Sequence, residues 1–207
     1  MITVYGFTVG RASRALWALE EAGEPYAFVR LDPSLGEHRT EAYLALNPAG
    51  KVPTLVDGDF VLTESGAIVT WVADRHPGLG LAPPAGTPAR AHYLQWCFFV
   101  LTELEQPLWT QTKHTFVLPP KLRVPQVIDT AKKEWSRPTA VLSAQLSARP
   151  FLLGEDFTMA DVLAGHSLAW ARSLGLPLGS DTLEAYADRV LGRPALARTT
   201  ARERAGS

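Results

Sequence analysis

One segment, residues 47–68, constrains the fold of this chain more than any other. Two short apolar runs, 54–56 and 60–62, flank an Asp-Gly-Asp sequence at 57–59, which is a turn signal typical of a β-hairpin. Pro53 stands directly before the first run, where a residue without an N–H group is tolerated at the start of a strand. The segment therefore predicts a loop, a tight hairpin and then the beginning of a helix.

The helix that follows the hairpin begins at polar residues suited to a ligand with an amino-acid end. Glu64 and Ser65 precede an apolar run with helical spacing, made of Ile68, Val69 and Val72. The free N–H groups and the positive dipole end of a helix N-terminus favour a carboxylate. The Glu64 carboxylate favours an ammonium group. The pair therefore indicates a site for the α-amino-acid end of a small ligand.

The residues before the hairpin extend this prediction to a peptide. A bend at Pro53 leaves the N–H and C=O groups of Val52 facing outward, where an extended peptide can pair with them. Lys51 is placed to meet a second carboxylate at the far end of that peptide. The alternative is an ordinary hairpin with a capped helix. That alternative explains any one of these residues alone, whereas the ordered set favours a ligand site.

The order of these residues resembles the glutathione site of the glutathione S-transferase family. The match covers Asn-Pro-x-x-Lys-Val-Pro, two short strands, and Glu-Ser-x-Ala-Ile. The resemblance implies that Val52, ahead of a cis Pro53, pairs with the cysteinyl backbone of glutathione. It also implies that Glu64 and Ser65 hold the γ-glutamyl group, and that Lys51 holds the glycyl carboxylate.

The resemblance reaches both halves of the chain. His38 falls where theta-like members of the family have a histidine that binds the glycyl group. Farther along, Thr158 can cap a helix and Asp161 can reach back to it, which is a capping box with Asp in place of the commoner Glu. Phe157 and Val162 are placed as the accompanying hydrophobic staple. We interpret this second motif as structural.

Patterning along the chain predicts two domains. Strand and helix signals before residue 78 follow the order βαβ, α, ββ, α of a thioredoxin-like domain, with a right-handed crossover in the first unit. Residues 79–86, rich in Pro and Gly, read as a linker. Helical patterning dominates afterwards. We therefore expect a thioredoxin-like α/β glutathione-binding domain over residues 1–78. An all-α helical-bundle domain over 87–207 would contribute the cosubstrate pocket.

The group that would activate the glutathione thiol is expected in the loop after the first strand. A free thiol is mostly protonated at neutral pH, so a donor or a positive field must lower its pKa. Many bacterial and theta-like members have a serine where this chain has Gly10. Alpha-like members use a tyrosine with an arginine six residues later, a spacing kept by Tyr5 and Arg11. Thr8 and Ser13 are the other hydroxyls within reach.

Several alternatives stay open for this loop. Tyr5 would donate its hydroxyl to the thiolate while Arg11 stabilises the charge, but a tyrosine at this position only packs in members that use serine. Ser13 would equally serve as a helix cap. A backbone N–H group of Gly10 or Arg11, at the helix N-terminus, would hold the thiolate without any hydroxyl.

Composition and charge exclude several classes of function. The net charge of −1 provides no electrostatic attraction to nucleic acid or to a membrane surface. No apolar run is long enough to span a bilayer. The single cysteine, Cys97, rules out an internal disulfide, and we interpret it as a core residue. Together with an N-terminus that lacks a signal pattern, this predicts a cytoplasmic protein. No His/Cys cluster indicates a metal.

We therefore expect a glutathione transferase that activates the glutathione thiolate for conjugation to a small hydrophobic electrophile. Phe7, Trp96 and Phe99 are candidates for the cosubstrate pocket, although aromatic residues at helical spacing more often belong to a core. The resemblance implies a homodimer, a role in detoxification and no cofactor beyond glutathione. The alternatives are a glutathione-dependent reductase or peroxidase, and a non-catalytic assembly module. The glycine at position 10 favours the module, whereas the intact ligand residues Lys51, Val52, Glu64 and Ser65 argue against it.

Overall fold

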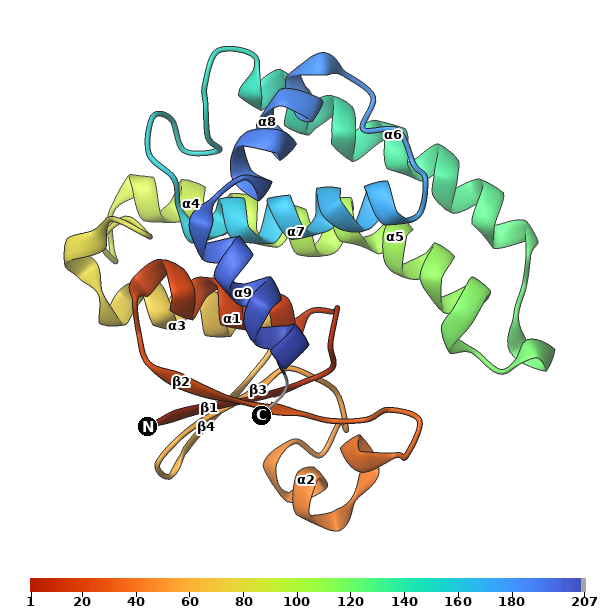
Figure 1. The fold of residues 1–207 in the computed structure, drawn as a ribbon. Helices are drawn as coiled ribbons and strands as arrows, with labels where there is room; N and C mark the ends of the chain where they lie inside the picture. The colour runs from red at the N-terminus through yellow and green to blue at the C-terminus, as the bar shows by residue number, and fades with distance from the viewer. Residues whose placement is uncertain (206–207) are drawn as a thin grey trace. The chain divides into compact units, whose positions relative to one another are not determined.

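The computed structural model describes residues 1–205 of the chain and divides them into two compact units. Unit 1 combines Met1–Ala82 with the C-terminal segment that begins at Gly192, and unit 2 spans Pro83–Leu191. The sequence pattern predicts a single helical domain over residues 87–207. The last helix, α9 (Pro194–Ala205), instead belongs to unit 1, because it packs against α1 (Ala12–Ala22) (Figure 1).

Unit 1 is built on a four-stranded mixed sheet with the order β2-β1-β3-β4. The strands are β1 (Ile2–Gly6), β2 (Tyr26–Arg30), β3 (Thr54–Asp57) and β4 (Phe60–Thr63). β1 runs parallel to β2, with α1 as the connection between them, and β3 is antiparallel to both β1 and β4. The predicted hairpin is confirmed, as is the thioredoxin-like order of elements.

Helices cover both faces of this sheet (Figure 1). α1 and α3 (Ser65–Arg75) lie on one face, and the short α2 (Glu41–Leu46) lies on the other. Gly6 lets α1 approach β1 closely, because a Cβ atom at this position would stand 2.3 Å from the Ala12 Cβ. Two short 3₁₀ helices complete the unit, η1 (Glu37–Arg39) and η2 (Pro77–Leu79).

Unit 2 consists of helices. They are α4 (Pro88–Phe99), the π-helical turn η3 (Val100–Leu104), α5 (Glu105–Thr112), a second π-helical turn η4 (Lys113–Val117), the 3₁₀ turn η5 (Pro120–Leu122), α6 (Gln126–Leu146), α7 (Met159–Ser173) and α8 (Asp181–Leu191). Residues 88–117 are thus helical throughout, with π-helical turns at 100–104 and 113–117. Pro107 lies just after the first of these turns and is buried. In the part of the chain described, no helix has both the length and the apolar character needed to cross a membrane.

The buried centre of unit 2 contains the predicted capping box at the start of α7. The Thr158 side chain and the Asp161 side chain each bond the backbone of the other, as the sequence pattern predicted. Asp161 is fully buried and also accepts hydrogen bonds from the Leu152 N–H at 3.0 Å and the Tyr186 hydroxyl at 2.8 Å. The carboxylate therefore joins α7 to α8 and to the segment before α7.

Candidate functional site

The register of the sheet brings the predicted ligand residues to one edge of unit 1. Tyr5 of β1 faces Thr54 of β3, and Thr54 faces Thr63 of β4. The C-terminal ends of β1 and β4 therefore lie beside the N-terminal end of β3. The loop after β1, the segment 51–53 before β3 and the pair 64–65 after β4 consequently meet at this edge.

Two side chains, those of Tyr43 and Asn47, shape the loop before β3. The buried Asn47 donates through Nδ2 to the Lys51 carbonyl at 2.8 Å and accepts through Oδ1 from the Ala49 N–H at 3.1 Å. The Tyr43 hydroxyl also donates to the Lys51 carbonyl and shares a 2.8 Å hydrogen bond with Thr54 Oγ1. These contacts fix the backbone on both sides of the Val52–Pro53 peptide, while the Lys51 side chain stays exposed.

The Val52–Pro53 peptide is cis, as the resemblance implies. It directly precedes β3, so Pro53 stands where its missing N–H group leaves no gap in the ladder. Val52 is half-buried and lies outside the strands. Its backbone therefore lies at the end of the sheet where β3 begins and β4 ends.

Gly50 places His38 next to this loop. The φ of Gly50 is +58°, and a Cβ atom there would stand 3.0 Å from the His38 carbonyl oxygen. A glycine is required because a side chain has no room and the backbone is left-handed. The His38 ring packs edge-on against Phe7, with 5.3 Å between ring centroids. Phe7, in the loop after β1, thus contacts His38, a residue predicted to bind glutathione.

Glu64 and Ser65 form the start of α3. Glu64 is exposed and has a φ of +66°, a backbone conformation that costs a non-glycine residue about 1–3 kcal/mol and that clusters at ligand sites. Its side chain does not cap its own helix. The Ser65 hydroxyl is buried and accepts a hydrogen bond from Arg14 Nη1 at 3.3 Å. Arg14 thereby ties the first turn of α1 to the start of α3.

The loop after β1 places its candidate groups differently. Tyr5 points to the sheet face that carries α2, where its ring lies 6.0 Å from that of Tyr43. Thr8 is exposed. Arg11 stands at the N-cap of α1 but makes no capping hydrogen bond through its side chain. Ser13 lies inside the first helical turn, so it is not the N-cap of α1, and its hydroxyl donates to Glu203 Oε1 at 2.6 Å.

Comparison with known proteins identifies the family. Residues 1–74 match the model for the glutathione S-transferase N-terminal domain, and residues 106–194 match that for the C-terminal domain. The chain belongs to the glutathione S-transferase family. It is 33% identical to human glutathione S-transferase theta-2 over 195 residues, which cover 88% of this chain and 77% of that protein. It is 32% identical to glutathione S-transferase GST-4.5 of Xanthomonas campestris over 153 residues, 72% of this chain and 74% of that protein.

Solved structures of glutathione S-transferases share the fold over nearly the whole chain. The theta class enzyme of Xanthomonas axonopodis pv. citri, solved with glutathione bound, has 31% identity and a TM-score of 0.81 over 96% of both chains. The glutathione S-transferase of Xylella fastidiosa has 27% identity and a TM-score of 0.87 over 98% of both chains. The two-part transferase fold expected from the sequence is therefore confirmed.

The aromatic residues predicted for the cosubstrate pocket fall in different units of this transferase family member. Trp96 and Phe99 lie on α4 of unit 2 and pack edge to face, with 5.3 Å between ring centroids. Trp96 is buried, as a core residue would be. Cys97, between them, is buried too, and burial raises the pKa of its thiol to about 12. The interpretation of Cys97 as a core residue is confirmed.

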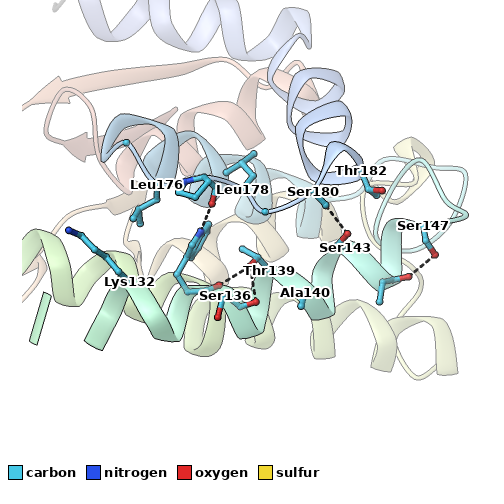
Figure 2. A pocket seen from close by; sticks show the side chains of 15 residues that line it. Lys132, Ser136, Thr139, Ala140, Ser143, Ser147, Leu176, Leu178, Ser180 and Thr182 are labelled. Carbon is cyan, nitrogen blue, oxygen red and sulfur yellow. Dashed lines mark hydrogen bonds between the residues drawn. The ribbon is translucent and has the colours of Figure 1, made fainter. Parts of the chain in front are cut away.

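Unit 2 also contains a cavity of about 860 Å³ that includes none of the predicted site residues (Figure 2). It lies between α6 and the segment that leads into α8. Several of its hydroxyl groups are engaged within the protein: Ser143 bonds Ser180 at 2.8 Å, and Thr139 bonds the Trp135 carbonyl at 2.8 Å (Figure 2). The cavity is therefore a feature of the helical unit itself, separate from the candidate glutathione site of unit 1.

Sequence reasoning missed the residues that support the site from elsewhere in the chain. Tyr43 and Asn47 hold the Lys51 carbonyl, and Glu203 bonds Ser13 from 190 residues away. Asn47 opens the recognised motif, so its role was within reach of a sequence argument. Glu203 had no comparable signal, because it stands among arginines in a helix that was expected to belong to the other domain.

Proposed function

We propose that this protein is a glutathione transferase that binds glutathione at the described edge of unit 1 and activates its thiol for attack on a small hydrophobic electrophile. Membership of the family supports the class of activity. The observation that carries the proposal is the convergence of three chain segments at one sheet edge, which follows from the pairing of Tyr5, Thr54 and Thr63.

In this proposal each end of glutathione meets a separate group. The Val52 backbone, beside the cis proline, pairs with the cysteinyl backbone. The free N–H groups at the start of α3 and the Ser65 hydroxyl hold the α-carboxylate, and the exposed Glu64 holds the ammonium group. Lys51 and His38 hold the glycyl carboxylate at the other end, since Gly50 brings their two segments together.

Tyr5, with Arg11, remains our leading candidate for thiol activation, and Thr8 or a backbone N–H group of the loop is the alternative. Tyr5 is placed beside the start of β3 by its pairing with Thr54. Ser13 is disfavoured as the donor. A hydroxyl has one proton to donate, and that of Ser13 is directed at Glu203.

The sole cysteine argues against a disulfide-exchange reaction that uses a protein thiol. The thiolate is the reactive form of cysteine. Cys97 is buried on α4, and its raised pKa leaves almost no thiolate at neutral pH. A peroxidase or reductase that relies on the glutathione thiol alone, and a non-catalytic module, remain as outcomes of the test below.

We also propose that the protein works as a cytoplasmic homodimer in detoxification, on the strength of the family resemblance. The chain's own dimerisation is measurable by light scattering coupled to size-exclusion chromatography. A monomer at micromolar concentration would contradict the dimer.

The experiment that tests the function is an ultraviolet difference titration of bound glutathione against pH, which follows the thiolate absorbance. A pKa well below that of free glutathione supports transferase chemistry. Binding with an unshifted pKa supports a module that keeps the ligand without activating it. No binding removes the assignment of Lys51, Glu64 and Ser65.

Three variants sharpen that test. Glu64→Ala and Ser65→Ala each remove a charged or hydrogen-bonding contact worth about 1–3 kcal/mol, so each should weaken glutathione binding about tenfold or more. Asp59→Ala is the matched control, because it removes an exposed carboxylate from the turn at the other end of the same hairpin. Unchanged affinity in both site variants would refute the placement of glutathione.

A further inference from the structure

We propose that Glu203, on the last helix of unit 1, is a positioning residue that holds the loop after β1 in the conformation that presents its thiol-activating groups. The inference rests on the proposed function, because the loop matters only if it stabilises a bound thiolate. It assigns a role to the C-terminal helix α9, which belongs to unit 1 although its sequence position predicted the helical domain.

Glu203 is bonded directly to the loop. The Ser13 hydroxyl donates to Glu203 Oε1 at 2.6 Å, and the Val9 backbone N–H also donates to this carboxylate. Ser13 Oγ in turn accepts a hydrogen bond from the Gly10 N–H at 3.4 Å. The N–H groups of two consecutive loop residues are therefore tied to Glu203, one directly and the other through Ser13.

Because Glu203 is buried, its carboxylate depends on these hydrogen bonds. The residue is 6% exposed, and a buried carboxylate is costly unless donors satisfy it. Burial raises the pKa of Glu203, while the bonds from Ser13 and Val9 lower it. The neighbouring Arg202 is directed elsewhere, with its guanidinium 5.5 Å from the centre of the Tyr26 ring.

The loop has a strained conformation that needs such a support. Val9 has a φ of +58°, which is sterically unfavourable for a β-branched residue. The residue is 84% exposed, so packing of its side chain does not hold the backbone in place. The hydrogen bond from the Val9 N–H to Glu203 acts on the strained residue itself, and it therefore helps to keep the loop in this conformation.

Separate ion pairs hold α9 on α1, which makes the role of Glu203 separable from the docking of its helix. Arg193 bonds both carboxylate oxygens of Glu21, at 2.6 and 2.7 Å. Arg198 bonds the Glu20 side chain at 2.7 Å. A variant at Glu203 should consequently loosen the loop while these pairs keep the helix in position.

The first measurement is made without glutathione, by hydrogen–deuterium exchange of the amide groups of Val9 and Gly10. Glu203→Ala should speed their exchange at least about tenfold, because it removes the acceptor of the Val9 N–H and the partner of Ser13. Arg198→Ala is the matched control: it removes a contact between α9 and α1 but leaves the loop bonds intact, so exchange at these two amides should not change. Unchanged exchange in Glu203→Ala would overturn the inference.

The second measurement connects the loop to chemistry. Glu203→Ala should raise the pKa of bound glutathione by about one unit and lower kcat about tenfold, with KM for glutathione within about twofold of the wild type. A purely structural role would instead lower stability and leave this pKa unchanged, as expected for Arg198→Ala. A normal thiol pKa in a variant with a loosened loop would overturn the positioning role.

A third variant covers the case in which Glu203→Ala does not fold. Glu203→Gln keeps the size and one acceptor oxygen, and should give intermediate exchange and an intermediate thiol pKa. The inference would be overturned if both Glu203→Gln and Ser13→Ala had the amide exchange and the thiol pKa of the wild type. If wild-type protein fails to shift the thiol pKa at all, the proposed function fails, and the exchange data still report separately on the loop.

Discussion

Replacing Asp161 by alanine should strongly destabilise unit 2, because the Asp161 carboxylate is buried and accepts several hydrogen bonds. Asp161 is fully buried and accepts from the N–H groups of Leu152 and Thr158, at 3.0 and 2.8 Å, and from the Tyr186 hydroxyl at 2.8 Å. The Thr158 hydroxyl lies 3.1 Å from the same carboxylate. Alanine would leave four buried donors, from three separate segments, without this acceptor.

The magnitude follows from the loss of the acceptor of those donors. A buried donor left unsatisfied costs about 1–3 kcal/mol, and more when its partner was charged. Because the losses share one site and are not additive, we expect a total of about 4–6 kcal/mol for Asp161→Ala. For a chain of this length each kcal/mol lowers Tm by about 2–4 °C, so the expected decrease is about 10–20 °C.

The assay is urea denaturation followed by circular dichroism, with a thermal melt as a second readout. Tyr186→Phe removes one donor and leaves Asp161 with its other bonds, so it should cost about 1–2 kcal/mol. Asp188→Asn is the control on the same helix as Tyr186, since its carboxylate is exposed and forms a surface ion pair with Arg172 at 2.8 Å. Such a pair contributes less than about 1 kcal/mol. If Asp161→Ala were no more destabilising than Asp188→Asn, the capping box would not be the structural centre described.

Three further outcomes are expected. Tyr5→Phe should lower turnover about tenfold or more and leave glutathione affinity within about twofold, because the hydroxyl would act on the thiolate and not on the bound ground state; stopped-flow and binding assays separate these, and full activity would move the role to Thr8 or the backbone. Cys97 should resist a thiol reagent at neutral pH and react only in denaturant, because burial raises its pKa to about 12; rapid labelling of the folded protein would contradict this. Gly6→Ala should destabilise unit 1 by about 1–3 kcal/mol or more, because the new Cβ would stand 2.3 Å from that of Ala12. Gly10→Ala is the control and should not destabilise the protein, since no atom lies within 4 Å of its new Cβ. Equal melting temperatures of the two variants would be inconsistent with this packing.

Local patterns were sufficient where the physics is local. The hairpin depends on a turn sequence between two apolar runs, and the register of its strands then follows from the tight turn. The capping box depends on two residues three positions apart. The cis peptide at Pro53 was implied by the family resemblance and is present.

The residues predicted to bind glutathione could be grouped from the sequence, but the residues that hydrogen-bond to them could not. The motif places Lys51, Val52, Glu64 and Ser65 within one short stretch, so a sequence argument can group them. The buried Arg14 that bonds Ser65 comes from a different helix. Tyr43 bonds the Lys51 carbonyl from α2. These contacts depend on how helices pack on the sheet, which no spacing rule specifies.

By itself, the sequence determined the two-part fold, the hairpin and the identity of the candidate glutathione residues, because turn chemistry, hydrophobic period and motif order act over short distances along the chain. Only the tertiary structure decided that α9 joins unit 1 and that Ser13 gives its proton to Glu203. The reason is that packing decides which residues are buried and which distant residues bond each other, as with Ser13 and Glu203, 190 positions apart. A sequence pattern can predict a helix, but it does not show which surface that helix will cover.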